Sequence, residues 1–564
     1  MKDKNEFYSI LQEIDGRELP ELTRLLGDYD FNRFIIKIAP MAPDEREAVL
    51  PIILRVTHAI SAFPVRLLES PLRRTALEDF LTRKLLAAIG RIASYDATGT
   101  ARRLILPPRI GQKILPRSTV QIADDYTDVR LRFLVPMQRN RIDATAFQSF
   151  FFEQMPELVQ EALLYCNMDL REVESFVEAM ENADEIRRSL STKAWIGFIG
   201  DGSMPHRKSG ADTPDYEYDK GLAIDASLSQ TVETALAGEV KGAAIKPGVT
   251  LILGDIKEGR VELMRAIAAG IYNHVSGDGR EYIVTMPDAV YISAEGERSV
   301  QRADIGCFTG SGDFTSFRAD ALHGQAASFV EALEAGARVI ICDEADSAPG
   351  FLGGDNRLQS LIGDNASFIP LAARVRQLSE ELGVSTIVGG QHAVGSFIPV
   401  ADDILLIEGG TLRNITKEAK SKWAGGSDAA IQPYDFTHLV ETARWVIPSS
   451  IDASVGRYDS VVDAPDENAI RFGRHTIQLS ALHQVADAQQ ALTIGLIIEY
   501  ARQRYLDQPR PVRELLDLVD RDLSTEGLDH VTRELRGDLA RPRRYEIAAA
   551  LNRLASLRVS RAAL

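Results

Sequence analysis

The sequence predicts an α/β protein whose middle third forms a mostly parallel sheet covered by helices. Three apolar runs carry this prediction, at residues 249–253 (VTLIL), 338–342 (RVIIC) and 385–388 (STIV). The first run meets a glycine-bounded loop and then a helical pattern that we expect to extend through His274. Strand, loop and helix in repetition are typical of a parallel sheet with helices on its faces.

The two flanking regions have different patterns. Before residue 150, residues 34–39 (FIIKIA) predict a strand, residues 74–89 predict an amphipathic helix, and residues 118–136 predict a pair of alternating strands. Residues 477–564 are dominated by helical periodicity. We therefore expect an N-terminal α+β domain at residues 1–150, an α/β core at 151–450 and a mainly α-helical domain at 451–564.

Composition excludes several classes of protein. The chain has 564 residues and a net charge of −17, so a surface that coats nucleic acid or anionic lipid as a whole is not expected. Its three cysteines are far apart and have no zinc or disulfide spacing. The first residues lack a signal-peptide pattern and no apolar run is long enough to span a bilayer, so we expect a cytoplasmic protein without membrane contact.

The stretch after the first buried strand has the spacing of a phosphate-binding loop. Gly254, four further residues, Gly259 and a helix follow the strand, an arrangement in which backbone N–H groups cradle phosphates. A working loop then places a Lys on the β- and γ-phosphates and a Ser or Thr on Mg²⁺, but this chain has Arg260 and Val261. The residues predicted to border a nucleotide are Gly254, Lys257, Gly259, Arg260, Val261 and Glu262. Lys257 is alternatively a solvated loop residue.

An acidic pair ends the second apolar run. In a phosphate-loop enzyme, Asp343 would hold Mg²⁺ and Glu344 would polarise the attacking water as a general base. Such a pair can also be a simple strand end or helix cap. Its position after a phosphate-loop-like turn favours the architecture of a nucleotide site, without deciding activity.

Several long strings resemble the ATPases of the ABC class, a family that includes a mitochondrial RNA-binding ATPase associated with RNA editing. They are GQKILPRS from Gly111, FIGDGSMPHRKSG from Phe198, GIYNHVSGDGREYIV from Gly270, EALEAGARVIICDEADSA from Glu331 with RLQSLI after it, GVSTIVGG from Gly383 and GDLARPRRYEIAAALNRL from Gly537. The resemblance implies an ABC-type P-loop nucleotide-binding core between the two flanking domains. It also implies ATP and Mg²⁺ as cofactors and a dimer as the assembly.

This chain departs from the family pattern in both halves of the expected site. The family's loop GGGYHGKST is GDIKEGRVE here, and its signature loop, roughly NASGSTSQA, is RADALHGQA at residues 318–326. The signature-like residues Leu322, His323, Gly324 and Gln325 therefore keep only the glutamine of the family pattern. An N-terminal loop that is usually rich in Gly, Ser and Lys is ATGTARR at residues 97–103, and Leu492 stands where the family has an Arg. His392 follows the strand at 385–388 where ABC proteins place a γ-phosphate switch, and is alternatively an incidental loop residue.

Two basic strings are candidate nucleic-acid contacts. They contribute Arg207 and Lys208 in a glycine-containing loop, and Arg541, Arg543 and Arg544 beside a predicted helix start. The alternatives are a solvated loop or a salt bridge for the first string, and packing and ion pairing for the second. Few aromatic residues accompany these arginines, so a stacking platform for single strands is not evident.

The sequence therefore favours a pseudo-ATPase that works as a nucleotide-binding or structural subunit, either as a homodimer or beside a competent paralogue, with RNA as a candidate partner. The first alternative is an active Mg-ATP hydrolase coupled to nucleic acid, with Glu344 as base. The second is a nucleic-acid-binding scaffold that uses no nucleotide.

Overall fold

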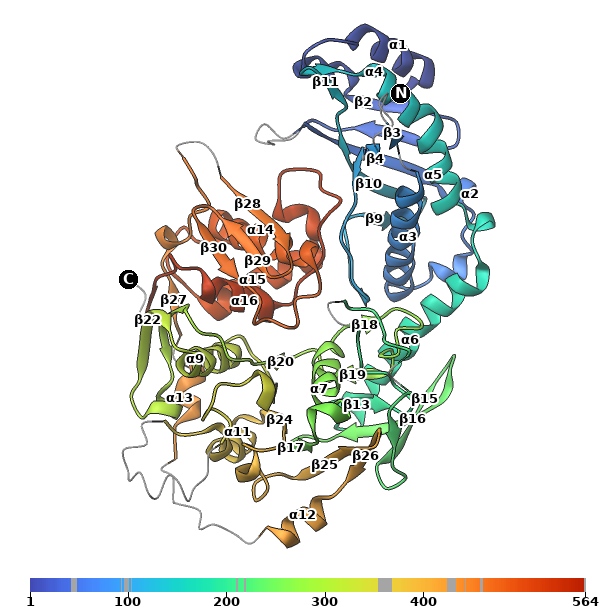
Figure 1. Cartoon of the computed structure of the whole chain (residues 1–564). Helices are drawn as coiled ribbons and strands as arrows, with labels where there is room; N and C mark the ends of the chain where they lie inside the picture. Colours follow the sequence, from blue (N-terminus) through green and yellow to red (C-terminus); the bar gives the residue numbers. More distant parts are fainter. Residues whose placement is uncertain are drawn as a thin grey trace. The chain divides into compact units, whose positions relative to one another are not determined.

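A computed structural model gives the fold of the chain (Figure 1). It describes residues 1–41, 48–92, 94–95, 101–102, 104–208, 211–217, 220–353, 368–423, 433–441, 443–456 and 460–561. The chain divides into two compact units. The first contains Met1–Ile110, Ile114–Met180 and Thr525–Arg541, and the second contains Gly111–Lys113, Glu181–Ser524 and Pro542–Leu564.

The first unit is α+β. Its sheet has the strand order β1 (Lys2–Asp3), β2 (Gly27–Asp30), β3 (Ile35–Ile38), β4 (Val49–Thr57), β10 (Tyr126–Leu134) and β7 (Ile105–Leu106), and β9 (Val120–Ile122) also pairs with β10. Its helices are α1 (Lys4–Ile14), α2 (His58–Ser61), α3 (Pro71–Arg91), α4 (Ala144–Ser149) and α5 (Met155–Ala162). The predicted strand at 34–39, helix at 74–89 and strand pair at 118–136 are confirmed. Helix α3 begins after Ser70, which accepts the N–H of Arg73, and has Pro71 at its first position.

The second unit is built on the predicted parallel sheet. The strand order is β14 (Ala223–Ile224), β26 (Thr411–Asn414), β25 (Asp403–Glu408), β17 (Val249–Leu253), β24 (Ser385–Gly390), β23 (Val339–Asp343) and β20 (Ala289–Tyr291). From β25 to β20 every neighbouring pair is parallel, whereas β26 runs antiparallel to β25. The α/β class is confirmed, and the three predicted apolar runs are the strands β17, β23 and β24.

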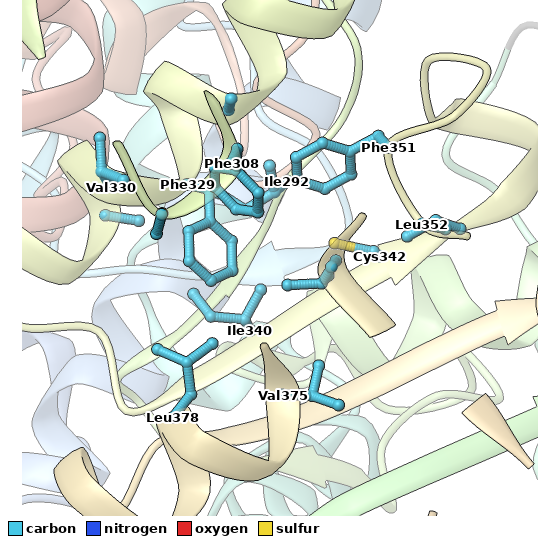
Figure 2. Packing of buried hydrophobic residues seen from close by; sticks show 14 of the residues in the cluster. Ile292, Phe308, Phe329, Val330, Ile340, Cys342, Phe351, Leu352, Val375 and Leu378 are labelled. Atoms are coloured by element: carbon cyan, nitrogen blue, oxygen red, sulfur yellow. The ribbon is translucent and has the colours of Figure 1, made fainter. Parts of the chain in front are cut away.

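Helices cover both faces of this sheet. An apolar cluster on one face joins alternate residues of the central strands to α9 (Ala321–Glu334) and α11 (Val375–Leu382). Figure 2 shows Phe308, Phe329 and Phe351 gathered over Ile340 and Cys342 of β23. Helix α7 (Arg260–Ala269) packs against the opposite face, because Met264 lies against Gly389 whereas the preceding Val388 belongs to the cluster. The sheet is therefore buried on both sides, as its continuous apolar strands require.

Helix α7 is shorter than the sequence predicts. It ends at Ala269, and residues Asn273–His274 form the short strand β18, so the expected helix through His274 is wrong. A Cβ at Gly270 would lie 2.6 Å from the carbonyl oxygen of Ile283. The chain therefore passes too close to β19 (Ile283–Thr285) for a larger residue at the end of the helix.

Further strands and helices lie outside the central sheet. A four-stranded antiparallel sheet contains β15 (Ser229–Thr234), β16 (Gly238–Ile245), β13 (Gly197–Gly200) and β19, and a hairpin joins β21 (Arg298–Asp304) to β22 (Asp313–Ala319). Helix α6 (Leu170–Thr192) is long, with 23 residues. Shorter elements are α8 (Gly306–Thr309), α12 (Thr416–Lys422), α13 (Phe436–Glu441), β27 (Trp445–Val446), β31 (Arg510–Pro511) and β32 (Val559–Ser560). The C-terminal part is helical as predicted, with α14 (Ala488–Tyr505), α15 (Val512–Thr525) and α16 (Arg544–Arg553). It also contains a three-stranded sheet that the sequence did not predict, β28 (Val462–Asp466), β29 (Ala469–Phe472) and β30 (His475–Gln478).

Candidate functional site

Parallel pairing brings the predicted site segments to one edge of the sheet. Leu253 at the end of β17 pairs with Gly390 of β24, and Asp343 at the end of β23 pairs with Gly389. The carboxyl ends of all three strands therefore meet, which is where open α/β sheets bind ligands. The loop after β17, the acidic pair after β23 and the residues after β24 form a single candidate site.

The phosphate-binding-loop region is a compact turn in which the N–H groups of residues 257–259 bond within the loop, whereas no side chain caps the start of helix α7. The Asp255 carboxylate accepts the Lys257 N–H at 2.9 Å, and the N–H groups of Glu258 and Gly259 bond to the carbonyls of Asp255 and Ile256, each at 3.1 Å. The bond from Lys257 holds the pKa of Asp255 below its usual range. Gly259 has φ +84°, and a Cβ there would lie 2.5 Å from the imidazole of His206. Lys257 itself is exposed to solvent.

Arg260 begins helix α7 and is buried, with a relative exposure of 2%. Its Nε donates to the Gly254 carbonyl at 2.9 Å, and its Nη1 donates to Oδ2 of Asp343 in a buried ion pair. Burial raises the pKa of Asp343, and the charge of Arg260 opposes that rise. The guanidinium therefore neutralises the carboxylate that was expected to face a metal ion.

The residues present do not fit a Mg²⁺ site. One oxygen of Asp343 is paired with Arg260, and the other accepts the Ala345 N–H at 2.8 Å. Val261 is buried and has no oxygen to offer. Within the described residues, no group of three or more His, Cys, Asp or Glu side chains is placed to hold a metal ion.

Glu344 is held by the backbone of the loop after β24. Its carboxylate accepts the N–H groups of Gln391, His392 and Ala393 at 2.6, 2.9 and 2.9 Å. Partial burial acts to raise the pKa of Glu344, but these three bonds outweigh it and the pKa lies below its usual range. His392 contributes its backbone to this contact, and the residue is exposed.

The paired glycines at the end of β24 leave room for both acids. A Cβ at Gly389 would lie 2.3 Å from Oδ2 of Asp343, and one at Gly390 would lie 2.8 Å from Oε2 of Glu344. The two glycines that end the string GVSTIVGG are therefore needed for steric reasons, which the sequence alone did not reveal.

The signature-like residues 322–325 form the beginning of helix α9. Asp320 caps this helix by accepting the N–H groups of Leu322 and His323, both at 3.0 Å, and its other oxygen lies 2.7 Å from the His323 Nδ1. Gly324 lies against the segment that precedes β21, because a Cβ at Gly324 would lie 2.2 Å from the Glu295 carbonyl oxygen. Gln325 is fully buried and donates to Ser347 at 3.0 Å while accepting the Ala348 N–H at 2.8 Å. It thereby fixes the segment that follows the acidic pair.

The structure places most basic candidates in internal ion pairs. Arg207 pairs with Asp278 at 2.6 Å, and Arg544 pairs with Asp517 at 2.7 Å. Arg543 pairs with Glu546 and also donates to the Pro287 and Ala289 carbonyls. Lys208 is exposed, and Arg541 is half-buried in the first unit.

Other residues that the sequence singled out are either half-buried on a helix or lie in segments outside the described residues. Glu262 is half-buried on α7, and Leu322 is half-buried on α9. Residues 97–100 and 103 of the string ATGTARR lie outside the described residues, as do 209–210 and the string RLQSLI. The capping roles of Asp255 and Asp320 were missed, although an Asp directly before a helical turn is a known start signal.

Comparison with solved structures finds remote likeness to ABC proteins. cbiO1 from Clostridium perfringens, described as part of the ABC transporter complex cbiONQ, is 16% identical, with 34% of this chain covering 90% of that chain at a TM-score of 0.23. A putative metal-chelate type ABC transporter in an inward-facing conformation is 12% identical, with 33% of this chain covering 79% of that chain at a TM-score of 0.19. No curated protein sequence matches the chain. No helix in the described ranges has the length and apolar character needed to cross a bilayer.

Family models match three consecutive regions of the chain. A model described as "ATPase of the ABC class N-terminal" matches residues 4–166, a P-loop domain model of ABC ATPases matches residues 169–435, and a model described as "MRB1590 C-terminal domain" matches residues 461–560. Their order agrees with a P-loop core between two flanking regions. The chain belongs to the family of ATPases of the ABC class.

Proposed function

We propose that this member of the ABC-class ATPases is a pseudo-ATPase whose hydrolysis is impaired. The buried ion pair between Arg260 and Asp343 carries the proposal. P-loop enzymes need a divalent cation to bridge the phosphates and neutralise developing charge. Here the carboxylate is paired with a guanidinium, and Val261 replaces the hydroxyl that would coordinate the cation.

The state of Glu344 supports the same proposal. A general base needs an oxygen directed at the attacking water and a pKa near the working pH. The Glu344 carboxylate accepts three backbone N–H groups, and these lower its pKa. An active enzyme would require Glu344 to exchange these bonds for a water molecule.

A hydrolysis assay tests the proposal directly. Phosphate release from Mg-ATP is measured for the wild-type chain and for Glu344→Gln prepared in the same way. We expect equal rates at the background level. Turnover in the wild type that Glu344→Gln abolishes would instead establish the active Mg-ATP hydrolase.

RNA binding is the second candidate function. It is favoured by the C-terminal region from Ala501, which has 13 Arg, no Lys and 10 acidic residues, or 13 − 10 = +3. It is opposed by the internal ion pairs of Arg543 and Arg544, which leave these side chains committed within the protein. Filter binding of single-stranded RNA at two salt concentrations, with and without ATP, tests it, because phosphate contacts weaken steeply with salt.

The assembly is part of the same proposal. The family resemblance implies a homodimer or a heterodimer with a competent paralogue. Analytical ultracentrifugation of the purified chain, alone and with ATP, measures its oligomeric state.

A further inference from the structure

We infer that the second unit has a separate small-molecule site at the amino ends of its central strands, and that this site binds a free amino acid with an aliphatic side chain. The site is a cavity of about 250 Å³. Thr250, which lines it, lies four residues before Gly254, or about 13 Å along an extended strand. The cavity is therefore distinct from the candidate nucleotide site, and the inference does not rest on the proposed loss of hydrolysis.

The floor of the cavity is a polar patch on one face of the parallel sheet. Thr250 of β17 is in register with Asp403 of β25, and Leu405 of β25 is opposite Asn414 of β26. The residues on either side of Thr250, and Ile404 between the two β25 residues, belong to the apolar cluster on the other face. Because side chains alternate along a strand, the four floor residues are directed away from that cluster.

Two polar groups of the floor are available to a ligand. Oδ1 of Asp403 accepts the Asn414 side-chain N–H at 3.1 Å, whereas Oδ2 has no hydrogen-bond or ion-pair partner among the described residues. Thr250 is 2% exposed, and its hydroxyl makes no hydrogen bond to any residue in the described ranges. A buried hydroxyl without a partner is unfavourable, and a polar ligand in the cavity would supply that partner.

A cationic side chain borders the same cavity. Lys246 follows β16, is exposed, and pairs with no acidic side chain in the part of the chain that the structure describes. Lys246 and Asp403 therefore present one charge of each sign to the cavity without neutralising each other. A molecule that carries both an ammonium and a carboxylate complements both side chains, whereas a simple cation or anion complements only one of them.

The rest of the cavity sets the size and character of the ligand. Leu228, Ile245 and Leu405 give it aliphatic surface, and Trp195 lines it while already stacking on Phe198, with ring centroids 6.2 Å apart and planes at 13°. The volume is below the roughly 300–1,000 Å³ of pockets that hold drug-sized molecules. A small zwitterion with an aliphatic group fits these walls better than an extended or purely polar molecule.

The ligand is oriented by its two charges. Its ammonium donates to Oδ2 of Asp403 and to the Thr250 hydroxyl, its carboxylate pairs with Lys246, and its side chain contacts the aliphatic wall. The cavity has residues of β15 and β16 on one side and of β25 and β26 on the other, and Figure 1 shows β16 beside β26. A bound amino acid would therefore join the antiparallel sheet to the parallel sheet and stabilise the folded chain.

Binding to the full chain tests this inference with L-leucine as the probe. Calorimetry and thermal melting compare it with L-leucinamide, which lacks the carboxylate, N-acetyl-L-leucine, which lacks the ammonium, and glycine, which lacks the aliphatic group. We expect L-leucine to bind and to raise the melting temperature, and each of the other three to bind at least about tenfold more weakly. Absence of L-leucine binding overturns the inference, and so does tighter binding of adenosine or glucose than of L-leucine.

Two charge variants assign the two ends of the ligand. Asp403→Asn keeps an acceptor for Asn414, so we expect L-leucine affinity to fall at least about tenfold while that of N-acetyl-L-leucine is unchanged. Lys246→Met should weaken L-leucine similarly and leave L-leucinamide unchanged. The matched controls are Glu408→Gln at the other end of β25 and Lys241→Met on β16, both exposed and outside the cavity lining. Equal L-leucine affinity in the two charge variants and the controls overturns the inference.

Thr250→Val provides a test that does not depend on a charge change. The substitution preserves the shape of the side chain and removes the unpartnered hydroxyl, so the variant without ligand should melt at or above the wild-type temperature. We expect its L-leucine affinity to fall about threefold or more, because the ammonium loses one hydrogen-bond acceptor. A Thr250→Val chain that binds L-leucine as tightly as the wild type would show that the ligand lies elsewhere. Phosphate release from Mg-ATP is measured separately and decides only the pseudo-ATPase proposal.

Discussion

Arg298 donates to both carboxylate oxygens of Glu331, at 2.8 and 2.6 Å, and both side chains are buried. The pair belongs to a larger network in which Arg444 contacts Glu334 and Arg553 contacts Glu295. Glu331 and Glu334 lie on α9, while Arg553 lies on α16. Arg444 also donates to Asn552 of α16, and Arg553 donates to Ser328 of α9, so these buried polar contacts join the helix that carries the signature-like residues to α16.

We expect Arg298→Met to destabilise the second unit by about 3 kcal/mol or more, because it leaves Glu331 buried with a reduced set of partners. Urea denaturation of the purified chain measures the effect. Arg318→Met is the matched control, since the Arg318–Glu297 pair has side-chain exposures of 77% and 68% and should contribute less than about 1 kcal/mol. Equal losses in the two variants would contradict the role assigned to the buried network.

Arg260→Met should be more destabilising at neutral pH than at acidic pH. Without the guanidinium, burial raises the pKa of Asp343 with nothing comparable to oppose it, so the folded state favours the protonated acid. The unfolded state then ionises at lower pH than the folded state, and stability falls as pH rises. Melting temperatures of the variant and wild type at pH 5 and pH 8 measure the difference. Arg265→Met, which removes the more exposed Arg265–Asp346 pair, should show a smaller loss with less pH dependence.

Gly389→Ala should disrupt the centre of the site. Its Cβ would lie 2.3 Å from Oδ2 of Asp343 and 2.7 Å from the Met264 Cγ, so the buried pair and helix α7 would both have to shift. We expect a loss of about 1 to 3 kcal/mol, typical of an overpacked core position. Gly312→Ala is the control, because no atom lies within 4 Å of a Cβ at that position. A melting temperature for Gly389→Ala that equals the control would show that the site has more space than the structure gives it.

The first unit should lose stability as pH rises toward 7. Glu78 on α3 accepts the Ile122 N–H at 2.8 Å, and burial raises its pKa from 4.5 to about 7, with Arg74 opposing the rise. The folded state therefore binds more protons than the unfolded state between these values, so the stabilisation is present below pH 4.5 and is lost by about pH 7. The full effect is at most about 3 kcal/mol.

The Glu78→Gln variant tests this pH dependence. It keeps an acceptor for the Ile122 N–H and cannot ionise, so its stability should change less between pH 5 and pH 7.5 and should exceed that of the wild type at the upper end. Chemical denaturation across this range measures both effects. Glu69→Gln, at a more exposed position just before α3, should follow the wild type; a parallel pH profile for Glu78→Gln would refute the assignment.

Local patterns in the sequence were sufficient to predict the central strands. They were also sufficient to show that the phosphate loop lacks its lysine and its hydroxyl side chain. Strand β17 has the predicted bounds, because its buried run is bordered by a glycine on each side. The C-terminal sheet of β28, β29 and β30 was missed, since those strands are short and alternate with polar residues. The caps at Asp255 and Asp320 have a local signal and could have been found from the sequence.

The sequence by itself determined which functional groups are missing, since the identities of Arg260 and Val261 exclude a lysine and a hydroxyl whatever the fold. The tertiary structure decided what the remaining charges do. Arg260 and Asp343 are separated by 83 positions and meet because β17, β24 and β23 are parallel neighbours whose carboxyl ends coincide. Burial at that edge then makes their pairing favourable, because an isolated charge would be costly in a region that water does not reach.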